Sequence, residues 1–202
     1  MELTILELLL WTLILHNMAF KDTILTFEDD KIVADPNYHN MEVMMSWEAP
    51  IMEKSAEYIC ESKGDILEIG FGMGICADYI QAEGVNSHTI VEIHPQIIEK
   101  LNIWASGKSN VTIVEGDWYS VNLDTYDGIF LDTFGDENWS SFKSFALAKG
   151  KSGAKVTYWN SIAEDRNEHS FDTISFEDII VIPDENEYFK SSNIYYMPKV
   201  VI

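Results

Sequence analysis

From Gly64 onward, short apolar runs alternate with segments of helical character. The expected strands cover residues 65–69, 88–93, 111–114, 128–131 and 154–159, and the expected helices cover residues 75–82, 95–105 and 139–148. Parallel strands need a crossover connection, which is usually a helix. This alternation therefore predicts an α/β fold, with a parallel sheet and helices on both of its faces.

The last part of the chain has a different pattern. Residues 173–182 and 194–202 are rich in strand-forming side chains, and the acidic stretch 184–187 separates them as a turn. Two neighbouring strands without a helix between them predict an antiparallel pair that closes the edge of the sheet. The complete pattern predicts a seven-stranded, mostly parallel sheet of the Rossmann-like type found in class I methyltransferases. Dinucleotide dehydrogenases do not end in this way.

Composition limits the kind of partner. The chain has 202 residues and 47% hydrophobic side chains, which fits one packed domain. Its 34 acidic residues outnumber 13 basic ones and give a formal net charge of −21. Such a surface repels nucleic acids and anionic lipids and attracts cations, so we expect a small cationic substrate and no nucleic acid. A surface that is acidic only for solubility is the alternative.

The two cysteines, Cys60 and Cys76, are too few for a disulfide scaffold. No Cys/His cluster has the spacing of a zinc site. We therefore expect reduced thiols, no metal and a cytoplasmic protein.

Residues 3–20 are strongly apolar, but Glu2 and Glu7 stand where a signal peptide needs positive charge. Glu7 would also be costly within lipid, so a membrane is not the expected partner. We expect residues 1–40 to form a helical extension that acts as a lid or packs on a partner, and residues 41–202 to form the main domain. A weak membrane contact, a protein start at Met18 and a homodimer remain open.

Residues 41–62 precede the expected sheet and predict a helical segment with a break near Pro50. This segment would lie over the mouth of the sheet.

In open α/β sheets, ligands bind at the carboxyl ends of the strands. The glycine loop 70–74 follows the first expected strand, and its glycines allow close approach of a ligand to a helix N-terminus. Glu92 follows 22 residues after Gly70, a spacing at which an acid accepts both ribose hydroxyls of an adenosine. After the third strand, Asp117 can accept from the adenine amino group and Trp118 can flank the ring.

These features together predict S-adenosyl-L-methionine (SAM) as cofactor, with S-adenosyl-L-homocysteine (SAH) as product. NAD is the alternative, but the loop lacks the sixth-position glycine of dinucleotide sites, and the terminal β pair argues against it. Taken singly, Glu92 and Asp117 could instead be helix N-caps.

Two further carboxylates suit a cationic acceptor. Asp132 follows the fourth expected strand, and Glu48 lies in the segment before the sheet. Two acids at one pocket match a planar guanidinium group, which they orient through paired hydrogen bonds. A carboxylate also takes the proton as the new bond forms. An exposed helix acid is the alternative for Glu48.

Three motifs carry a family resemblance. They are residues 44–52 (Met-Met-Ser-Trp-Glu-Ala-Pro-Ile-Met), 67–74 (Leu-Glu-Ile-Gly-Phe-Gly-Met-Gly) and 126–133 (Tyr-Asp-Gly-Ile-Phe-Leu-Asp-Thr). Together they resemble guanidinoacetate N-methyltransferases and the related fungal arginine methyltransferases. Residues 156–160 and 195–198 extend the resemblance, which covers roughly residues 41–202.

The resemblance implies that Glu48 and Asp132 grip the guanidino group and that Glu92 holds the ribose of SAM. It implies acceptor contacts from Trp159, Asn160 and Ser161, largely through the backbone. The expected cofactor site comprises Met44, Met52, Glu68, Gly70, Phe71, Gly72, Met73, Gly74, Glu92, Ile93, Gly116, Asp117, Trp118 and Asp132. This chain has Asp117 at a position where guanidinoacetate enzymes are not acidic.

The expected function is therefore methyl transfer from SAM to a guanidino nitrogen, as in guanidinoacetate or arginine. The sequence departs from the family at residues 161–171, which are short and polar where a helix is expected, so the acceptor end would be more open. A methyltransferase of another small amine, one of protein arginine, and a SAM-binding subunit without turnover remain alternatives.

Overall fold

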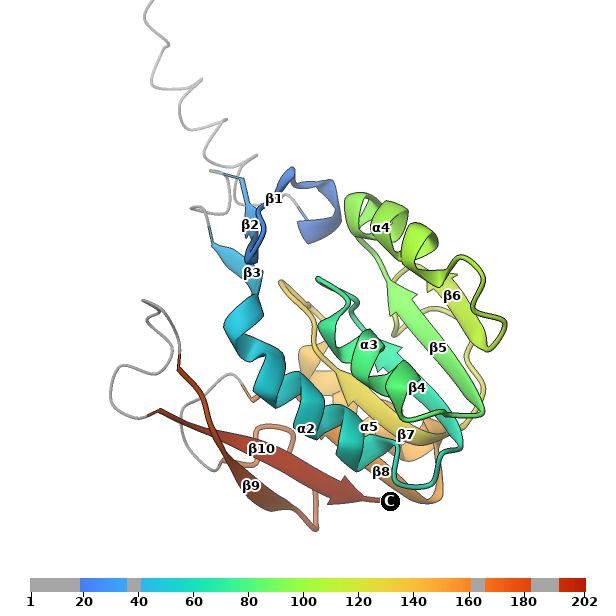
Figure 1. Cartoon of the computed structure of the whole chain (residues 1–202). Helices are drawn as coiled ribbons and strands as arrows, with labels where there is room; N and C mark the ends of the chain where they lie inside the picture. The colour runs from blue at the N-terminus through green and yellow to red at the C-terminus, as the bar shows by residue number, and fades with distance from the viewer. Residues whose placement is uncertain (1–18, 36–40, 161–165, 183–192) are drawn as a thin grey trace, which may run out of the picture.

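The computed structural model describes residues 19–35, 41–160, 166–182 and 193–202 (Figure 1). The apolar segment 1–18 and Ser161 of the expected acceptor site lie outside the described residues.

A seven-stranded sheet forms the centre of the molecule, in the order β6-β5-β4-β7-β8-β10-β9. The strands are β4 (Asp65–Ile69), β5 (Ser87–Glu92), β6 (Val111–Glu115), β7 (Tyr126–Leu131), β8 (Gly150–Tyr158), β9 (Ser175–Ile180) and β10 (Ile194–Val201). The strands from β4 to β8 pair in parallel, whereas β10 is antiparallel to both β8 and β9. The predicted Rossmann-like sheet with an antiparallel end is confirmed.

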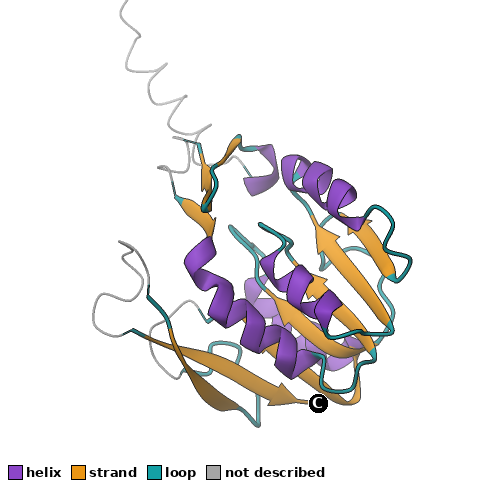
Figure 2. Cartoon of the chain, viewed as in Figure 1, coloured by secondary structure: helices purple, strands orange, loops and turns teal. Residues whose placement is uncertain are grey.

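Helices cover both faces of this sheet, as Figure 2 shows. They are α2 (Ala49–Ile59), α3 (Ile75–Ala82), α4 (Pro95–Ala105) and α5 (Phe142–Lys149). Side chains alternate along a strand, so Ile66 of β4 packs with α2 and α3 while Leu67 packs with α5. Helix α4 packs on Ile90 of β5. Because the order of strands reverses at β4, the ends of β4, β5 and β7 converge where such folds bind ligands.

The segment before β4 differs from the expected broken helix. A three-stranded antiparallel sheet contains β1 (Leu25–Phe27), β2 (Lys31–Ala34) and β3 (Glu42–Met45). The short 3-10 helices η1 (Phe20–Asp22) and η3 (Ser46–Glu48) flank this small sheet. Helix α2 then begins at Ala49, with Pro50 in its first turn. Proline has no N–H to donate and is favoured at this position, so Pro50 starts the helix instead of breaking it.

The described part of the expected helical extension 1–40 thus consists of η1, β1 and β2. Among the described helices, none is long and apolar enough to cross a membrane.

The close packing of α2 on β7 gives a stability prediction. A Cβ atom on Gly128 would lie 2.2 Å from the carbonyl oxygen of Ile59 and 2.8 Å from Cδ1 of Ile66. Since the first of these atoms belongs to the helix backbone, α2 would have to move. We expect Gly128→Ala to lower the free energy of unfolding by about 1–3 kcal/mol, measured by urea denaturation. The exposed strand variant Thr112→Ala is the control, and equal stability of the two variants would contradict this packing.

Candidate active site

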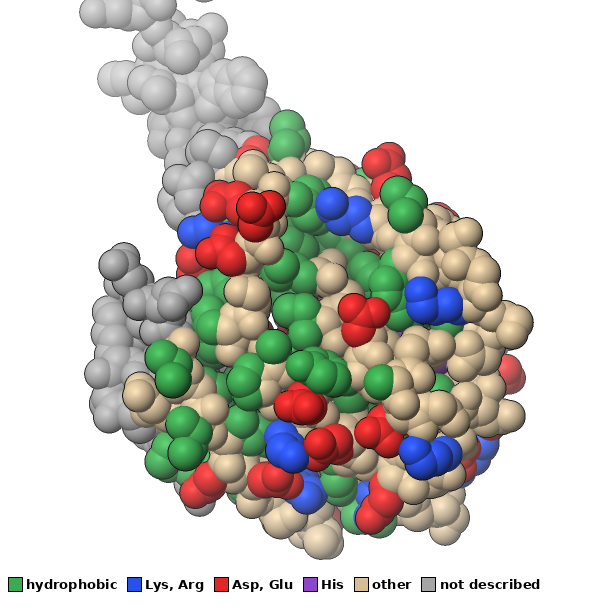
Figure 3. Space-filling model, in the orientation of Figure 1, with side chains coloured by type: hydrophobic (Ala, Val, Ile, Leu, Met, Phe, Trp, Pro, Cys, Tyr) green, Lys and Arg blue, Asp and Glu red, His purple; other side chains and the backbone are tan. Residues whose placement is uncertain are grey.

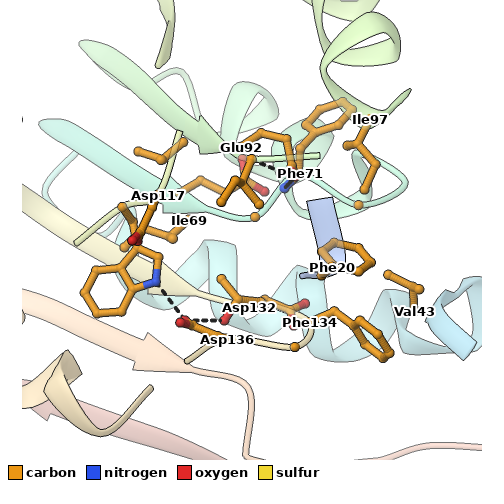
Figure 4. A pocket seen from close by; sticks show the side chains of 18 of the residues that line it. Phe20, Val43, Ile69, Phe71, Glu92, Ile97, Asp117, Asp132, Phe134 and Asp136 are labelled. Atoms are coloured by element: carbon orange, nitrogen blue, oxygen red, sulfur yellow. Dashed lines mark hydrogen bonds between the residues drawn. The ribbon is translucent and has the colours of Figure 1, made fainter. Parts of the chain in front are cut away.

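A cavity of about 330 Å³ lies at the carboxyl ends of β4, β5, β6 and β7. Figure 3 shows apolar side chains gathered around a hollow between the small sheet and α4. Figure 4 shows the cavity wall from close by. Most of the residues predicted to bind the cofactor line it: Met44, Met52, Glu68, Gly70, Phe71, Gly72, Glu92, Ile93, Gly116, Asp117, Trp118 and Asp132.

The glycine loop after β4 requires glycine at two positions. Gly70 has a φ of +90°, and a Cβ there would lie 1.9 Å from the carbonyl oxygen of Asp132. Gly72 has a φ of +53°, and its Cβ would lie 2.4 Å from the sulfur of Met44. Both values of φ favour glycine. The loop therefore lies directly against Asp132 and Met44, with its backbone lining the cavity.

Glu92 ends β5 and lines the cavity with a buried carboxylate. Its Oε2 accepts the backbone N–H of Phe71 at 3.0 Å, and its Oε1 accepts those of Ile93 and His94 at 2.7 and 2.8 Å. Burial raises the pKa of Glu92, and the bonds from the backbone oppose that rise. Glu92 is not the N-cap of α4, because His94 occupies that position. Its contacts link the glycine loop to the end of β5.

Asp117 and Trp118 follow β6 and are held by neighbouring groups. The backbone N–H of Tyr119 donates to Oδ1 of Asp117 at 2.9 Å, and the amide of Asn138 donates to Oδ2 at 3.0 Å. The indole N–H of Trp118 donates to Oδ2 of Asp136 at 2.7 Å. Trp118 therefore forms part of the wall while most of its ring is buried.

Three acids gather where β4, β7 and α2 meet. Burial and the neighbouring Glu68 raise the pKa of Asp132 to about 7. Burial and the nearby Asp132 raise the pKa of Glu48 well above its ordinary value. Burial also raises the pKa of Glu68, whose Oε2 pairs with Nε2 of His88 at 2.8 Å. Buried carboxylates that repel one another need a cationic ligand or a proton.

One carboxylate oxygen of Glu68 also lacks a hydrogen-bond donor in the part of the chain that the structure describes. Its Oε1 is buried without a hydrogen-bond partner among the described residues. Lys21 is the single basic side chain among the described residues that line the cavity, whereas six acids line it: Glu68, Glu92, Asp117, Asp132, Asp136 and Glu137. The cavity therefore favours ligands that carry positive charge.

Glu48 is close enough to Asp132 for that acid to raise its pKa, but Glu48 is not part of the cavity wall. Its side chain is buried, and its Oε1 accepts the backbone N–H of Met45, the N-cap of η3, at 2.9 Å. The alternative of an exposed helix acid is therefore wrong.

Trp159 and Asn160 follow β8 beside Asp132, outside the wall of the cavity. The backbone N–H of Trp159 donates to the carbonyl oxygen of Leu131 at 2.8 Å. The backbone N–H of Asn160 donates to the phenol oxygen of Tyr195 at 2.7 Å.

Of the glycine-loop residues predicted to bind the cofactor, Met73 and Gly74 also lie outside the wall: Met73 packs on the core and Gly74 caps α3.

Sequence reasoning missed several wall residues: Phe20, Val43, Cys76, Ile97, Phe134 and Asp136. Phe20 comes from η1 and packs against Phe134, with ring centroids 5.1 Å apart. The chain that follows η1 is held to α4 by Gln96. The backbone N–H of Leu25 donates to Oε1 of Gln96 at 2.8 Å, and Nε2 of Gln96 donates to the carbonyl oxygen of Leu25 at 3.1 Å. An apolar residue in a short segment carries no local signal of this role.

The raised pKa of Asp132 predicts a pH-dependent gain of stability in Asp132→Asn. The folded pKa of about 7 exceeds the value of about 3.9 in unfolded chains, so ionisation destabilises the native state as pH rises between these values. The melting temperature of the variant minus that of the wild type should grow from about pH 4 to about pH 7 and then level off. The exposed Asp124→Asn is the control, and a difference independent of pH would contradict the assignment.

Comparisons with known proteins identify the family of this chain. A family model described as guanidinoacetate N-methyltransferase matches residues 23–194. Similar curated proteins are each named protein arginine N-methyltransferase 2. The Aspergillus oryzae protein is 32% identical over 162 residues, which cover 74% of this chain and 38% of that protein. The Kluyveromyces lactis protein is 35% identical over 163 residues, 73% of this chain and 39% of that protein. This chain thus spans about two fifths of the length of these relatives.

Solved structures share the fold. The N-methyltransferase NodS from Bradyrhizobium japonicum, solved with S-adenosyl-L-homocysteine, matches with a TM-score of 0.61 and 11% identity, over 77% of this chain and 87% of that one. Spermidine synthase from Thermotoga maritima matches with a TM-score of 0.60 and 11% identity, over 88% and 72%. Likeness at such identity shows the fold alone. The match of the family model over most of the chain shows more: this chain belongs to the guanidinoacetate N-methyltransferase family.

Proposed function

We propose that this chain binds SAM and transfers its methyl group to a guanidino nitrogen. The observation that carries the proposal is the group of neighbouring acids, Glu48, Asp132 and Glu68, in which Asp132 raises the pKa of Glu48 and Glu68 raises that of Asp132. Membership of the guanidinoacetate N-methyltransferase family supports it. The fungal relatives, named as protein arginine methyltransferases, point to the same chemical group.

The residues of the cavity fit SAM in shape and charge. The volume of about 330 Å³ lies within the range of small-molecule sites. The glycine loop leaves backbone exposed for close approach, and Glu92 presents a carboxylate at the end of β5, where ribose hydroxyls would donate to it. The unpartnered Oε1 of Glu68 can accept a hydrogen bond from the amino group of the methionine portion. Apolar side chains such as Phe20 and Ile97 line another part of the cavity.

Asp132 and Glu48 would hold the acceptor. A guanidinium ion between them neutralises two carboxylates that otherwise repel each other, and its planar N–H groups donate to both. Asp132 lines the same cavity as the glycine loop and lies against Gly70. This arrangement supports an acceptor end next to the expected position of the methionine portion. Orientation of this kind supplies much of the rate in a displacement reaction.

Proton transfer falls to Asp132. Bound SAM supplies a methyl group activated on a sulfonium sulfur, so that the carbon–sulfur bond breaks as the carbon–nitrogen bond forms. A guanidinium nitrogen is a poor nucleophile while it keeps its proton. A carboxylate of Asp132 that localises the positive charge away from the attacking nitrogen, and accepts its proton at an Oδ atom, removes this obstacle. A pKa of about 7 suits a group that gains and loses a proton near neutral pH.

The proposal specifies the guanidino group of the acceptor and leaves the rest of the acceptor undefined. Guanidinoacetate, free arginine and an arginine in a polypeptide all present the group that the acids would grip. The net charge of −21 favours acceptors of positive overall charge. Turnover with a simple amine in place of a guanidine would favour the small-amine alternative. Binding of SAM without any product would favour a subunit that does not turn over.

The first test addresses the cofactor. Glu92→Ala removes the carboxylate expected to accept both ribose hydroxyls, so the affinity for SAM should fall by about ten- to a hundredfold, measured by calorimetry. The control is Glu115→Ala, which removes the exposed acid at the end of the adjacent strand β6. Circular dichroism should show that both variants are folded. Unchanged affinity in folded Glu92→Ala would remove Glu92 from the cofactor site.

The second test addresses the acceptor. Asp132→Asn keeps the shape but loses the charge and the proton acceptor, so turnover should fall by at least about 10²-fold while SAM still binds. Glu48→Gln should behave similarly, and the double variant should lose less than the product of the two single effects, because the acids act as a unit. Product formation from arginine, guanidinoacetate and simple amines is measured in parallel. Near-normal turnover of Asp132→Asn with the best acceptor would contradict the carboxylate mechanism.

A further inference from the structure

Asp136, which no motif predicts, connects two loops at one end of the cavity (Figure 4). Its Oδ2 accepts the indole N–H of Trp118 at 2.7 Å and the hydroxyl of Thr133 at 2.8 Å. Its Oδ1 accepts the backbone N–H of Asn138 at 2.7 Å. One carboxylate thus holds three donors, two from its own loop and one from the loop after β6.

A second bridge connects the same two loops. The side-chain amide of Asn138 donates to Oδ2 of Asp117 at 3.0 Å, and the backbone N–H of Tyr119 donates to the other oxygen of Asp117 at 2.9 Å. Asp136 also holds the backbone of Asn138, so the two bridges support each other. Side chains therefore fix the loop after β7 to the loop after β6.

Trp118 gives this connection a rigid anchor. Its side chain is only 4% exposed and meets Phe145 of α5 edge-on, with ring centroids 4.8 Å apart. It belongs to the core cluster that includes Leu67 and Ile129 of the main sheet. A buried indole N–H that lost its acceptor would leave an unsatisfied donor. The position of Asp136 is thus determined by the core of the domain.

The other end of the loop is fixed at the centre of the site. The backbone N–H of Asp132 donates to the carbonyl oxygen of Ile69 at 2.9 Å, next to Gly70. Between the two fixed ends, Phe134 contacts Phe20 and both line the cavity. The carboxylate of Asp136 therefore determines the path of the whole loop along the cavity wall.

From this geometry we propose that Asp136 is a positioning residue for the nucleoside part of the cofactor. It would keep Trp118 and residues 133–138 in the arrangement that binds an adenosine group. The inference rests on the proposed function for the identity of the cofactor. It is independent of the acceptor, because Asp136 bonds none of the three acids Glu48, Glu68 and Asp132.

The test measures the binding of SAH and of adenosine by calorimetry. In Asp136→Asn, an NH2 group replaces one carboxylate oxygen, so that it faces the N–H of Asn138 if it takes the place of Oδ1, or the donors of Trp118 and Thr133 if it takes the place of Oδ2. We expect the Kd of both ligands to rise about tenfold. The KM for SAM should rise by a similar factor, while kcat at saturating SAM stays within about twofold of the wild type, since the acids near the acceptor are intact.

Two further variants separate positioning from general stability. Asp124→Asn alters an exposed acid of the loop after β6 that is not part of the cavity wall, and it should leave both Kd values unchanged. Thr133→Val keeps the volume, removes only one of the three donors, and should raise Kd about threefold; it replaces Asp136→Asn if that variant does not fold. An Asp136→Asn protein that melts at a lower temperature but binds SAH with wild-type affinity overturns the inference.

The outcomes also distinguish this inference from the proposed function. A wild-type protein that binds neither SAH nor adenosine overturns both. A wild-type protein that binds SAH but methylates no guanidino acceptor overturns only the proposed acceptor. If adenosine binding is unchanged in Asp136→Asn while SAH binding falls, Asp136 does not act at the nucleoside end, and the inference is wrong.

Discussion

The contact between the backbone of Gly70 and the carbonyl oxygen of Asp132 is the constraint around which the site is arranged. A side chain at position 70 would overlap that oxygen, since its Cβ would lie 1.9 Å away. Backbone hydrogen bonds from Gly70 to Val91 and from Asp132 to Ile69 hold the ends of β4, β5 and β7 together at this point. Everything that faces the cavity is placed relative to this junction.

Three acidic side chains lie near this junction, and few basic side chains among the described residues are near enough to balance their charge. Burial raises the pKa of Glu48, Glu68 and Asp132, and each of these rises reports a free-energy penalty for the ionised form. His88 offsets part of the penalty for Glu68. The remaining penalty is relieved when a cation binds, so part of the binding energy of a cationic ligand comes from strain already present in the folded protein. Stability and ligand affinity are therefore linked through the same carboxylates.

The sequence predicted the features that have a local pattern. Periodicity predicted the strands from β4 to β8, their helices and the terminal β pair. The ends of the expected strands predicted that Gly70, Glu92 and Asp132 would lie near one another. Strand β3 was missed because residues 41–62 were interpreted as one helical segment with a break near Pro50, whereas Pro50 lies in the first turn of α2. Contacts between distant segments leave no local signal: Phe20 meets the cavity only through packing with Phe134, and Asp136 gains its role from Trp118, 18 residues earlier.

The position of β10 affects the order in which the molecule assembles. In the sheet, β10 lies between β8 and β9, although it follows both in the chain. Neither strand can complete its pairing until β10 enters between them, and such long-range closure is slow compared with local structure formation. Tyr195 of β10 also holds the backbone of Asn160 beside Asp132. We therefore expect the side of the cavity at which the acceptor is proposed to bind to become ordered late in folding, after the glycine loop and β5.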